Sequence, residues 1–482
     1  MKVSAAKAAL GIPERNEYLM MIPGLTETIF RRYDIRGIVN ESLTRKIIYN
    51  IGKAYAAQLI DKGEHKAIVA HDVRLSSPGF AREFTAALLE SGIDVASIGM
   101  VPTPVAYFAV HHLGISNAAI ITGSHNPSHY NGIKLVADGL PLHSEKLKRL
   151  HHRICKEDYY KGKGTFSEID VVPAYLDSII EDIQLKRPLK IAVDCGNGIA
   201  GLTAPKLLNY LGCEVSELYC DPDGRFPNHH PNPSIPENLE ALKTVLKKGD
   251  FDIGLAFDGD GDRLGVMDRD GNIIWPDRQM ILLSQDILKK IPGATIIFDV
   301  KSSTHLEKSV AKLGGKPLMW QSGHALIRHK MATTRDAALG GELSGHLYFN
   351  DRWFGFDDAL YAAARLLELI SSDPRPSTEI FGALPNSINT PELSVDFDCE
   401  TQLFQFMDQF IKQEKDFPGA RICHIDGLRI DYDDGWGLVR ASHTSPSLSL
   451  RFEADNQTAL SRIQNKFRSE LHAIKPELLL PF

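Results

Sequence analysis

The sequence is poor in cysteine, contains no long apolar run and has no excess of basic residues. Its six cysteines among 482 residues form no Cys-x-x-Cys pair, so a disulfide framework is excluded and reduced thiols are expected. No apolar stretch approaches the roughly 20 residues that span a bilayer. Lys and Arg total 54 against 61 Asp and Glu, and the resulting net charge of −7 argues against a nucleic-acid-binding protein.

Residues 1–25 contain two early lysines and a short apolar stretch that runs into Pro13, Glu14 and Arg15. This pattern does not match a secretory signal, so we expect a cytoplasmic protein. The composition, 43% hydrophobic and 24% charged, is that of a folded globular protein. At about 150 residues per domain, the length predicts three or four domains.

Three segments repeat one pattern. Residues 67–72, 191–194 and 296–299 are apolar and end in Asp, and turn residues and helical patterns follow. Such apolar runs are typical of parallel strands that are covered on both faces. After the third run, Ser302, Ser303 or Thr304 would cap a helix. The pattern favours three related α/β domains, although such units occur in any α/β protein.

The last hundred residues differ from the rest. Residues 393–397 and the alternating SLSLRF at 447–452 predict half-buried strands, with helices near 400–414 and 458–473. Strands and helices without the buried parallel signature indicate a smaller α+β domain. Two prolines and polar turn residues at 385–391 predict a linker, either a hinge or a rigid loop.

The segment TGSHNP (122–127) follows an apolar run. We expect Gly123 to relieve the backbone and Pro127 to fix the exit, which would present Ser124 at the end of a strand. A serine so placed can be a nucleophile or a phosphate carrier. The segment does not fit the Gly-x-Ser-x-Gly elbow of α/β-hydrolases. The alternative is a polar turn in which Ser124 and Asn126 bond the backbone.

The segment DGDGDR (258–263) places three carboxylates within five residues. They repel one another unless a cation neutralises them, and the interleaved glycines let the backbone curl so that Asp258, Asp260 and Asp262 converge. Hard divalent ions prefer such oxygen ligands. The loop lacks the Gly and Glu of an EF-hand, which leaves magnesium with a phosphate oxygen as the better match. The alternative is a solvated acidic turn.

Two further loops combine glycine with polar residues. In GGELSGH (340–346), alternation puts Glu342, Ser344 and His346 on one side, where they can grip vicinal hydroxyls. In RASHTSP (440–446), an arginine and hydroxyls are suited to a phosphate dianion. A glycine-rich turn and an exposed hairpin tip are the alternatives. Together, the four loops predict phosphoryl transfer on a phosphorylated polyol.

At this point the sequence resembles the α-D-phosphohexomutases, and most closely their bacterial phosphomannomutase/phosphoglucomutase subgroup. The matching motifs, in the family's order, are YDIRG (33–37), TGSHNP, DGDGDR, GELSGH (341–346) and RASHTSP. The stretches FPNHHPNP (226–233) and RWFGFDDALYAAARLLE (352–368) also look like that subgroup. The resemblance covers about residue 26 to the C-terminus.

The resemblance implies an α/β protein of four domains around a central cleft, three of them related α/β domains with mixed sheets and the last an α+β domain. The predicted ranges are 1–25 for an N-terminal extension outside the resemblance, 26–170 for domain I with the phosphoserine loop, 171–273 for domain II with the metal loop, 274–386 for domain III with the sugar-binding loop, and 387–482 for domain IV with the phosphate-binding loop.

The resemblance also implies a mechanism. Ser124 would carry a phosphoryl group, and Mg²⁺ would be held by a phosphoserine oxygen and the three aspartates of DGDGDR. The group would pass to a hexose phosphate of mannose or glucose, giving a hexose 1,6-bisphosphate that turns over in the cleft. Such transfer relies on positioning and on charge stabilisation. The expected partner is a small phosphosugar, with no nucleic acid and no membrane, and the protein is expected to be a monomer.

Carried over residue by residue, the resemblance assigns further roles. Around the reacting phosphoryl group it places Arg36, His125, Lys134 and Arg263. His346 would transfer a proton at the sugar hydroxyl, since its ordinary pKa of about 6.5 suits that task. The remaining substrate-binding residues would be Tyr33, Lys301, His324, Glu342, Ser344, Arg440, Ser442, His443 and Thr444. Taken singly, Lys301 could only cap a strand, and His324 could be a structural imidazole.

Two positions depart from the subgroup. Leu343 stands where Met is usual, whereas the glucosamine-phosphate branch has Gln there, so the residue leans away from glucosamine phosphate. His443 stands where Asn is usual, which predicts tighter substrate binding at lower pH. Two alternatives stay open: a phosphoglucosamine mutase, and a metal-dependent sugar phosphatase or kinase. A P-loop kinase is unsupported because the Gly-x-x-x-x-Gly-Lys-Ser/Thr motif is lacking.

Overall fold

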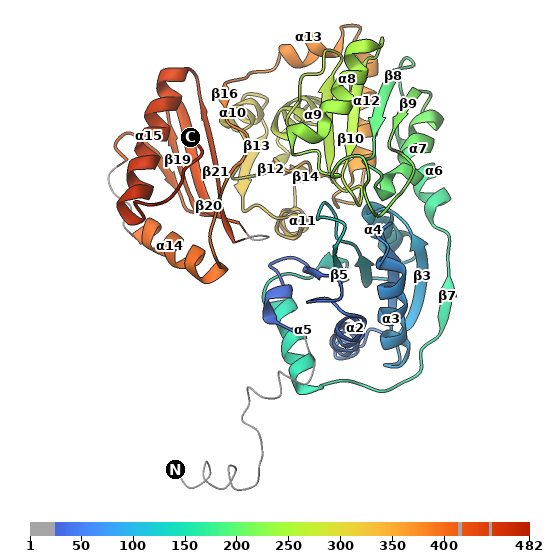
Figure 1. Ribbon diagram of the computed structural model, residues 1–482. Helices are drawn as coiled ribbons and strands as arrows, with labels where there is room; N and C mark the ends of the chain where they lie inside the picture. Colours follow the sequence, from blue (N-terminus) through green and yellow to red (C-terminus); the bar gives the residue numbers. More distant parts are fainter. Residues whose placement is uncertain (1–24, 413–416, 443–445) are drawn as a thin grey trace, which may run out of the picture.

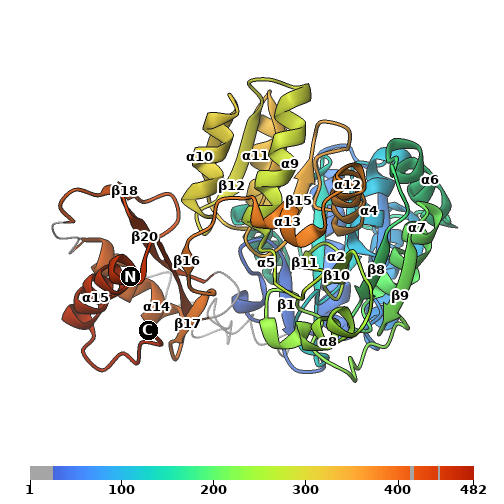
Figure 2. The same cartoon turned by 90° about the horizontal axis from the view of Figure 1, so that it is seen from above.

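The computed structural model describes residues 25–412, 417–442 and 446–482. The chain folds into four domains, which we number I to IV with the ranges given above (Figure 1). Domain IV lies at one end of the molecule next to domain III, and domains I and II lie on the other side (Figures 1 and 2). No helix in the described part of the chain has both the length and the apolar character to cross a membrane.

Domain I is built on a sheet with the strand order β1-β5-β4-β2-β3-β7, and β6 pairs with β5. Its elements are β1 (Ile35–Ile38), α2 (Arg45–Ile60), β2 (Lys66–His71), α3 (Ser77–Leu89), β3 (Asp94–Met100), α4 (Thr103–His112), β4 (Ala118–Ile121), β5 (Tyr130–Ala137), β6 (Leu140–Pro141), α5 (Glu145–Lys156) and β7 (Phe166–Glu168).

Domains II and III each contain a four-stranded sheet, ordered β11-β10-β8-β9 and β13-β12-β14-β15. The elements of domain II are α6 (Val172–Asp182), β8 (Lys190–Asp194), α7 (Ala204–Tyr210), β9 (Glu214–Leu218), α8 (Glu240–Lys248), β10 (Ile253–Phe257) and β11 (Leu264–Asp268). Those of domain III are α9 (Pro276–Lys290), β12 (Thr295–Asp299), α10 (Thr304–Lys312), β13 (Lys316–Trp320), α11 (His324–Thr333), β14 (Ala337–Gly341), β15 (Leu347–Phe349), α12 (Ala359–Ser372) and α13 (Ser377–Gly382).

The first three sheets share one topology. In each, a central strand (β2, β8 or β12) is parallel to both neighbours, and one of those neighbours (β4, β10 or β14) pairs with an antiparallel strand (β5, β11 or β15). The central strands correspond to the three apolar runs of the sequence. The predicted mixed-sheet α/β fold is therefore confirmed, and Ser303 is the predicted helix cap, accepting the backbone N–H of His305 at 3.0 Å.

Domain IV has a sheet with the order β16-β21-β20-β19-β18, and β17 also pairs with β21. Its elements are β16 (Ile388–Asn389), β17 (Leu393–Asp396), α14 (Glu400–Lys412), β18 (Arg421–Cys423), β19 (Leu428–Tyr432), β20 (Gly435–Ala441), β21 (Ser447–Ala454) and α15 (Gln457–Ile474). Part of the predicted linker, 385–391, is thus a strand of this sheet, because β16 pairs with the end of β21.

Strand β21 corrects one expectation, because it is buried along its whole length rather than half-buried. Its alternation is real: Leu448, Leu450 and Phe452 belong to the hydrophobic core of domain IV. Two of the polar alternate residues, however, contact domain III: Arg451 Nη1 lies 3.1 Å from Asp277 Oδ2, and Glu453 accepts from Ser303. Polar residues on a strand therefore indicate a second partner here and not solvent.

The hydrophobic cores join three domains and leave the fourth separate. One cluster of buried side chains runs from the α4 side of domain I through domain II into domain III. Stacked aromatic rings strengthen it where domains I and III meet: the centroids of Phe108 and Trp353 are 5.9 Å apart. Domain IV has its own cluster under α14 and α15. Domain IV is held to domain III by polar contacts and by a small buried cluster in which Val300 of domain III packs with Trp436 and Leu438 of domain IV.

Candidate active site

The functional loops of domains I to III occupy the same place in their sheets. The Ser124 loop connects β4 to β5, the aspartate loop connects β10 to β11, and the GELSGH loop connects β14 to β15. In each case this is the connection between the parallel part of the sheet and its antiparallel strand. The fourth loop joins β20 to β21, and two residues before its middle, Arg440 and Ser442, line one cavity with residues of the other three loops.

A cavity of about 300 Å³ lies where these loops meet. The predicted site residues in its wall are Tyr33, Arg36, His125, Arg263, Lys301, His324, Glu342, Ser344, His346, Arg440 and Ser442. Ser124, Lys134, Asp258, Asp260 and Asp262 are buried behind the wall and contact one another, as described below. His443 and Thr444 lie outside the described residues. All the predicted site residues that the structure describes therefore come together.

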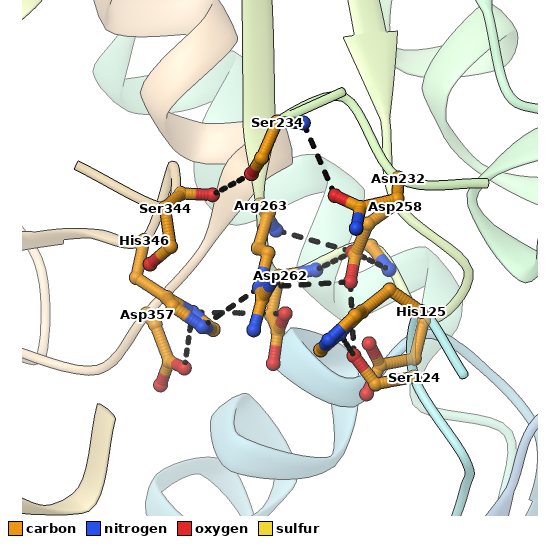
Figure 3. Close-up of polar contacts among 12 residues, drawn as sticks. Ser124, His125, Asn232, Ser234, Asp258, Asp262, Arg263, Ser344, His346 and Asp357 are labelled. Atoms are coloured by element: carbon orange, nitrogen blue, oxygen red, sulfur yellow. Dashed lines mark hydrogen bonds and ion pairs between the residues drawn. The ribbon is translucent and has the colours of Figure 1, made fainter. Parts of the chain in front are cut away.

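Ser124 has a left-handed backbone, with φ of 47°, which is uncommon for a residue with a side chain. The expectation that Gly123 relieves the backbone is wrong: its φ lies outside the left-handed range. Gly123 is instead required by close packing, because a Cβ there would lie 2.6 Å from the guanidinium carbon of Arg74. The Oγ of Ser124 donates to Asp258 Oδ2 at 3.0 Å and lies 3.1 Å from His125 Nδ1 (Figure 3).

The aspartate loop folds around Asp258. Its Oδ1 accepts the backbone N–H groups of Gly261, Asp262 and Arg263 at 3.0 to 3.2 Å. Gly259 brings this loop against the serine loop, because a Cβ at that position would lie 2.4 Å from the carbonyl oxygen of Ser124. The two loops therefore touch through their backbones.

The three aspartates fit a divalent cation. One carboxylate oxygen from each lies within 4.8 Å of the others, and all three side chains are buried. Oδ1 of Asp260 and Oδ1 of Asp262 have no hydrogen-bond partner among the described residues. Burial, and then the neighbouring carboxylates, raise the pKa of Asp258 well above its ordinary range. An oxygen-ligated cation such as Mg²⁺ would satisfy these atoms and this charge.

Cations surround Ser124. The Nζ of Lys134 donates to Asp260 Oδ2 at 2.8 Å and to Asp262. Burial disfavours the charged ammonium, but these two carboxylates outweigh it and raise the pKa of Lys134. Arg36 donates to Asp34 Oδ2 at 2.8 Å. Burial, together with neighbouring arginines, lowers the pKa of His125 well below its ordinary value, which keeps it neutral.

His346 lies between a carboxylate and an arginine (Figure 3). Its Nδ1 is 3.0 Å from Asp357 Oδ2 and 3.6 Å from Asp262 Oδ1, and its Nε2 accepts from Arg263 Nε at 3.0 Å. Burial disfavours its charged form, yet Asp262 and Asp357 raise the pKa of His346. A histidine with this surrounding is suited to moving a proton in the cavity.

The other wall of the cavity presents groups for hydroxyls and phosphate. Oε1 of Glu342 accepts the backbone N–H of Gly323 at 2.6 Å, and its Oε2 accepts from Tyr348. Lys301 Nζ donates to Glu392 Oε2 at 2.9 Å. Arg440 Nε donates to Asp426 Oδ2 at 2.9 Å, while its Nη2 has no hydrogen-bond partner among the described residues. Arg440 therefore keeps a buried donor for an anionic ligand.

Sequence reasoning missed several residues of the site. Thr103, at the start of α4, donates its hydroxyl to Asp260 Oδ2 at 2.6 Å. Glu392 lines the cavity, and Ser234 reaches it from domain II by donating to Ser344 O at 3.1 Å. Asp357 lies within the stretch 352–368, and Ser234 directly follows the stretch 226–233. Both stretches resemble the family, and this resemblance could have indicated the two residues. Thr103 and Glu392 had none, because only the tertiary contacts connect them to the loops.

The fold and the site are those of an α/β enzyme, with a presented serine beside three buried aspartates and a cavity lined by arginine, lysine and histidine side chains. Comparison with known proteins identifies the family. Family profiles described as phosphoglucomutase/phosphomannomutase match in four consecutive parts: alpha/beta/alpha domains I, II and III at residues 27–161, 173–271 and 275–388, and the C-terminal domain at 405–470.

Relatives match over nearly the whole chain. A phosphomannomutase/phosphoglucomutase of Pseudomonas aeruginosa is 46% identical over 95% of this chain and 99% of its own, and a phosphoglucomutase of Neisseria gonorrhoeae is 47% identical over the same shares. A solved phosphoglucomutase/phosphomannomutase family protein of Burkholderia thailandensis is 44% identical, covering 95% of this chain and all of its own, with a TM-score of 0.89.

The chain therefore belongs to the phosphoglucomutase/phosphomannomutase family. The predicted family, the four-domain fold and the class of enzyme, an isomerase of phosphosugars, are confirmed. The domain boundaries and the roles of the individual site residues stay predictions.

Proposed function

We propose that the enzyme interconverts the 1-phosphates and 6-phosphates of mannose and glucose through a phosphorylated Ser124 and a hexose 1,6-bisphosphate. The observation that carries this proposal is the position of Ser124. Its Oγ lies 3.0 Å from Asp258 Oδ2 and 3.1 Å from Nδ1 of His125, and His125 lines the cavity together with the proposed hydroxyl-binding and phosphate-binding residues of domains III and IV. A phosphoryl group on Ser124 and a sugar in the cavity would then be adjacent.

Asp258, Asp260 and Asp262 would hold Mg²⁺ together with an oxygen of the phosphoserine. When bound, the cation supplies charge stabilisation for the transferring phosphoryl group. Arg36, Lys134 and Arg263 would neutralise and orient the remaining phosphoryl oxygens, and neutral His125 would hydrogen-bond the serine oxygen. These roles need positioned positive charge and no further nucleophile.

His346 would take the proton from the attacking sugar hydroxyl and return it in the second half-reaction. Arg263 now donates to its Nε2, so the incoming phosphate must draw Arg263 away before that nitrogen can accept a proton. Asp357 would keep the ring oriented through Nδ1. A single histidine can serve both directions because its imidazole takes up a proton in one half-reaction and releases it in the other.

The opposite wall would hold the part of the substrate that does not react. Glu342 and Ser344 would bind sugar hydroxyls, and Tyr33, Lys301 and His324 would complete this end. Arg440 and Ser442 would bind the distal phosphate, along with His443 and Thr444. The cavity must therefore accept the bisphosphate in two orientations, because either phosphate can face Ser124.

The choice of sugar is less closely tied to Leu343 than the sequence suggested. Its side chain is buried and is absent from the described residues of the cavity wall. We infer that both mannose and glucose phosphates are substrates, in line with the name of the Pseudomonas relative, whereas the Neisseria relatives are named for glucose alone. The monomeric state, the cytoplasmic location and the lack of nucleic-acid or membrane partners stay predictions.

A coupled assay tests the proposal. The purified enzyme, with Mg²⁺ and a trace of hexose 1,6-bisphosphate, is given mannose 1-phosphate, glucose 1-phosphate or glucosamine 1-phosphate, and inorganic phosphate is monitored. We expect comparable turnover of the first two without phosphate release. Dominant glucosamine turnover would instead indicate a phosphoglucosamine mutase. Phosphate release without isomerisation would indicate a phosphatase and contradict the proposal.

A further inference from the structure

Arg74 is a buried residue that neither the cavity nor the predicted site includes. It follows β2, and its side chain has no exposed surface. Its Nη1 donates to the carbonyl oxygens of Pro127 and Tyr130 at 2.6 and 2.9 Å, and its Nη2 donates to those of Ser124 and Asn126 at 2.7 and 2.5 Å. One guanidinium therefore binds four carbonyls of the serine loop.

The guanidinium is itself held in place. Its Nε lies 3.2 Å from Asp72 Oδ2, which also accepts the backbone N–H of Gly123 at 3.2 Å. Asp72 Oδ1 fixes the local turn by accepting the backbone N–H of Arg74 at 3.0 Å. On the other side lies Phe226 of domain II, whose ring centroid is 5.1 Å from the guanidinium carbon. A buried charge this fully surrounded has one available position.

This position determines where Ser124 can be. The carbonyl oxygen of Ser124 lies between Arg74 Nη2, at 2.7 Å, and Gly259 of the aspartate loop, where no Cβ would fit. The same carbonyl is thus contacted from two domains. Because the backbone of Ser124 is left-handed, loss of these contacts would let it relax toward a commoner conformation and carry Oγ away from Asp258.

We infer that Arg74 is a positioning residue for phosphoryl transfer: it holds the left-handed Ser124 in line with the aspartate loop without touching the substrate. The inference rests on the proposed function. Lysine cannot replace it, because an ammonium is a point donor, whereas the fork of arginine reaches four fixed carbonyls at once. Its effect should therefore fall on kcat and on the phosphorylation of Ser124, while substrate binding is unchanged.

The test compares Arg74→Lys with Arg365→Lys. Arg365 is an equally buried arginine whose fork binds Asp351 at 2.9 and 2.8 Å and covers the ring of Phe349, but which lies in α12 and contacts none of the four loops. Three quantities are measured: kcat, KM for glucose 1-phosphate, and the rate at which hexose 1,6-bisphosphate phosphorylates Ser124, followed by mass spectrometry. Thermal unfolding reports stability.

We expect both variants to lose stability to a similar extent, while Arg74→Lys alone loses roughly 100-fold in kcat and in phosphorylation rate with KM nearly unchanged, as for a misplaced reacting group. Equal activity of the two variants, or a rise in KM alone, would overturn the inference. Should Arg74→Lys not fold, Gly123→Ala displaces the same guanidinium from the loop side and is expected to give the same kcat-only loss. A wild-type enzyme without mutase activity would refute the proposed function instead.

Discussion

The two ends of the cleft are joined by different kinds of contact. Between domains I and II, the serine and aspartate loops meet through their backbones at Ser124 and Gly259, and the backbone N–H of Thr103 donates to Asp260 O at 2.9 Å. Between domains III and IV, side chains make the junction, both polar ones and a small apolar cluster around Val300. Arg429 Nη1 donates to Val300 O at 2.6 Å, and the hydroxyl of Ser303 donates to Glu453 at 2.7 Å.

This difference indicates which distances in the site must be held precisely. Backbone contacts leave no free rotamer, so the distance between Ser124 and the aspartates is fixed by the fold. Side-chain contacts can be remade in another rotamer, so domains III and IV can adjust to either orientation of a ligand. We therefore expect substitutions at the first end to lower kcat and those at the second to raise KM.

The largest expected effect is at the aspartate loop. Asp260→Asn removes one charge from the cation site and a partner of Lys134, and we expect kcat to fall roughly 1000-fold. The matched control is Asp268→Asn, a buried carboxylate of the same domain that binds only neighbouring backbone and Asn272. Steady-state kinetics across a Mg²⁺ titration measures both. Equal activity of the two variants would show that the loop holds no catalytic cation.

Gly259→Ala should have the next largest effect. The new Cβ would lie 2.4 Å from the carbonyl oxygen of Ser124, so the two loops must separate. We expect kcat to fall roughly 100-fold with KM unchanged. Gly382→Ala is the control, since no atom lies within 4 Å of its added Cβ. A rise in KM with kcat intact would contradict the assignment of this junction to the chemical step.

Arg440→Lys tests the other end. Lysine keeps the charge but loses the fork, and with it the buried Nη2 that has no hydrogen-bond partner among the described residues. We expect KM to rise roughly tenfold, equivalent to ~1.4 kcal/mol, with a smaller change in kcat. Arg421→Lys is the control, because Arg421 is an arginine of the same domain that binds a carboxylate, Glu307 of domain III, on the exposed surface and away from the cavity. A loss in kcat alone for Arg440→Lys would contradict the expectation that substitutions at the domain III–IV junction raise KM.

The last effect concerns stability rather than catalysis, and it depends on pH. Burial and nearby Lys134 lower the pKa of His324 to about 3, so the folded protein keeps it neutral. Its side chain takes up a proton below pH ~6.5 in the unfolded chain, so the contribution of His324 to stability falls as pH decreases from 6.5. Between pH 6.5 and 5 this contribution is at most about 2 kcal/mol. Hydrogen exchange of the amides of α11, followed across this pH range, measures the change in stability. We expect the pH dependence to disappear in His324→Gln. An unchanged pH dependence in this variant would show that other groups cause it.

The sequence predicted the elements whose signals are local. The three apolar runs that end in Asp are the central strands of three sheets, and their ends hold the loops: Asp72 accepts the N–H of Gly123, and Asp299 accepts that of Leu343 at 3.3 Å. The DGDGDR loop was also recognisable, because three carboxylates so close in sequence repel one another unless a cation binds between them. Burial of the polar side of β21 could not be predicted from the sequence. Alternation of polar and apolar residues alone cannot show whether solvent or domain III covers the polar side.

By itself, the sequence determined the strand and helix pattern, the residue types that the four loops present and the family. The tertiary structure decided which residues far apart in the chain support that chemistry: Arg74 behind Ser124, Thr103 beside Asp260, and Glu392 against Lys301. The physical reason is the separation along the chain between the contacting residues. Spacing within a loop fixes which groups can converge locally, whereas a contact across 50 to 157 residues exists only once separate sheets have packed.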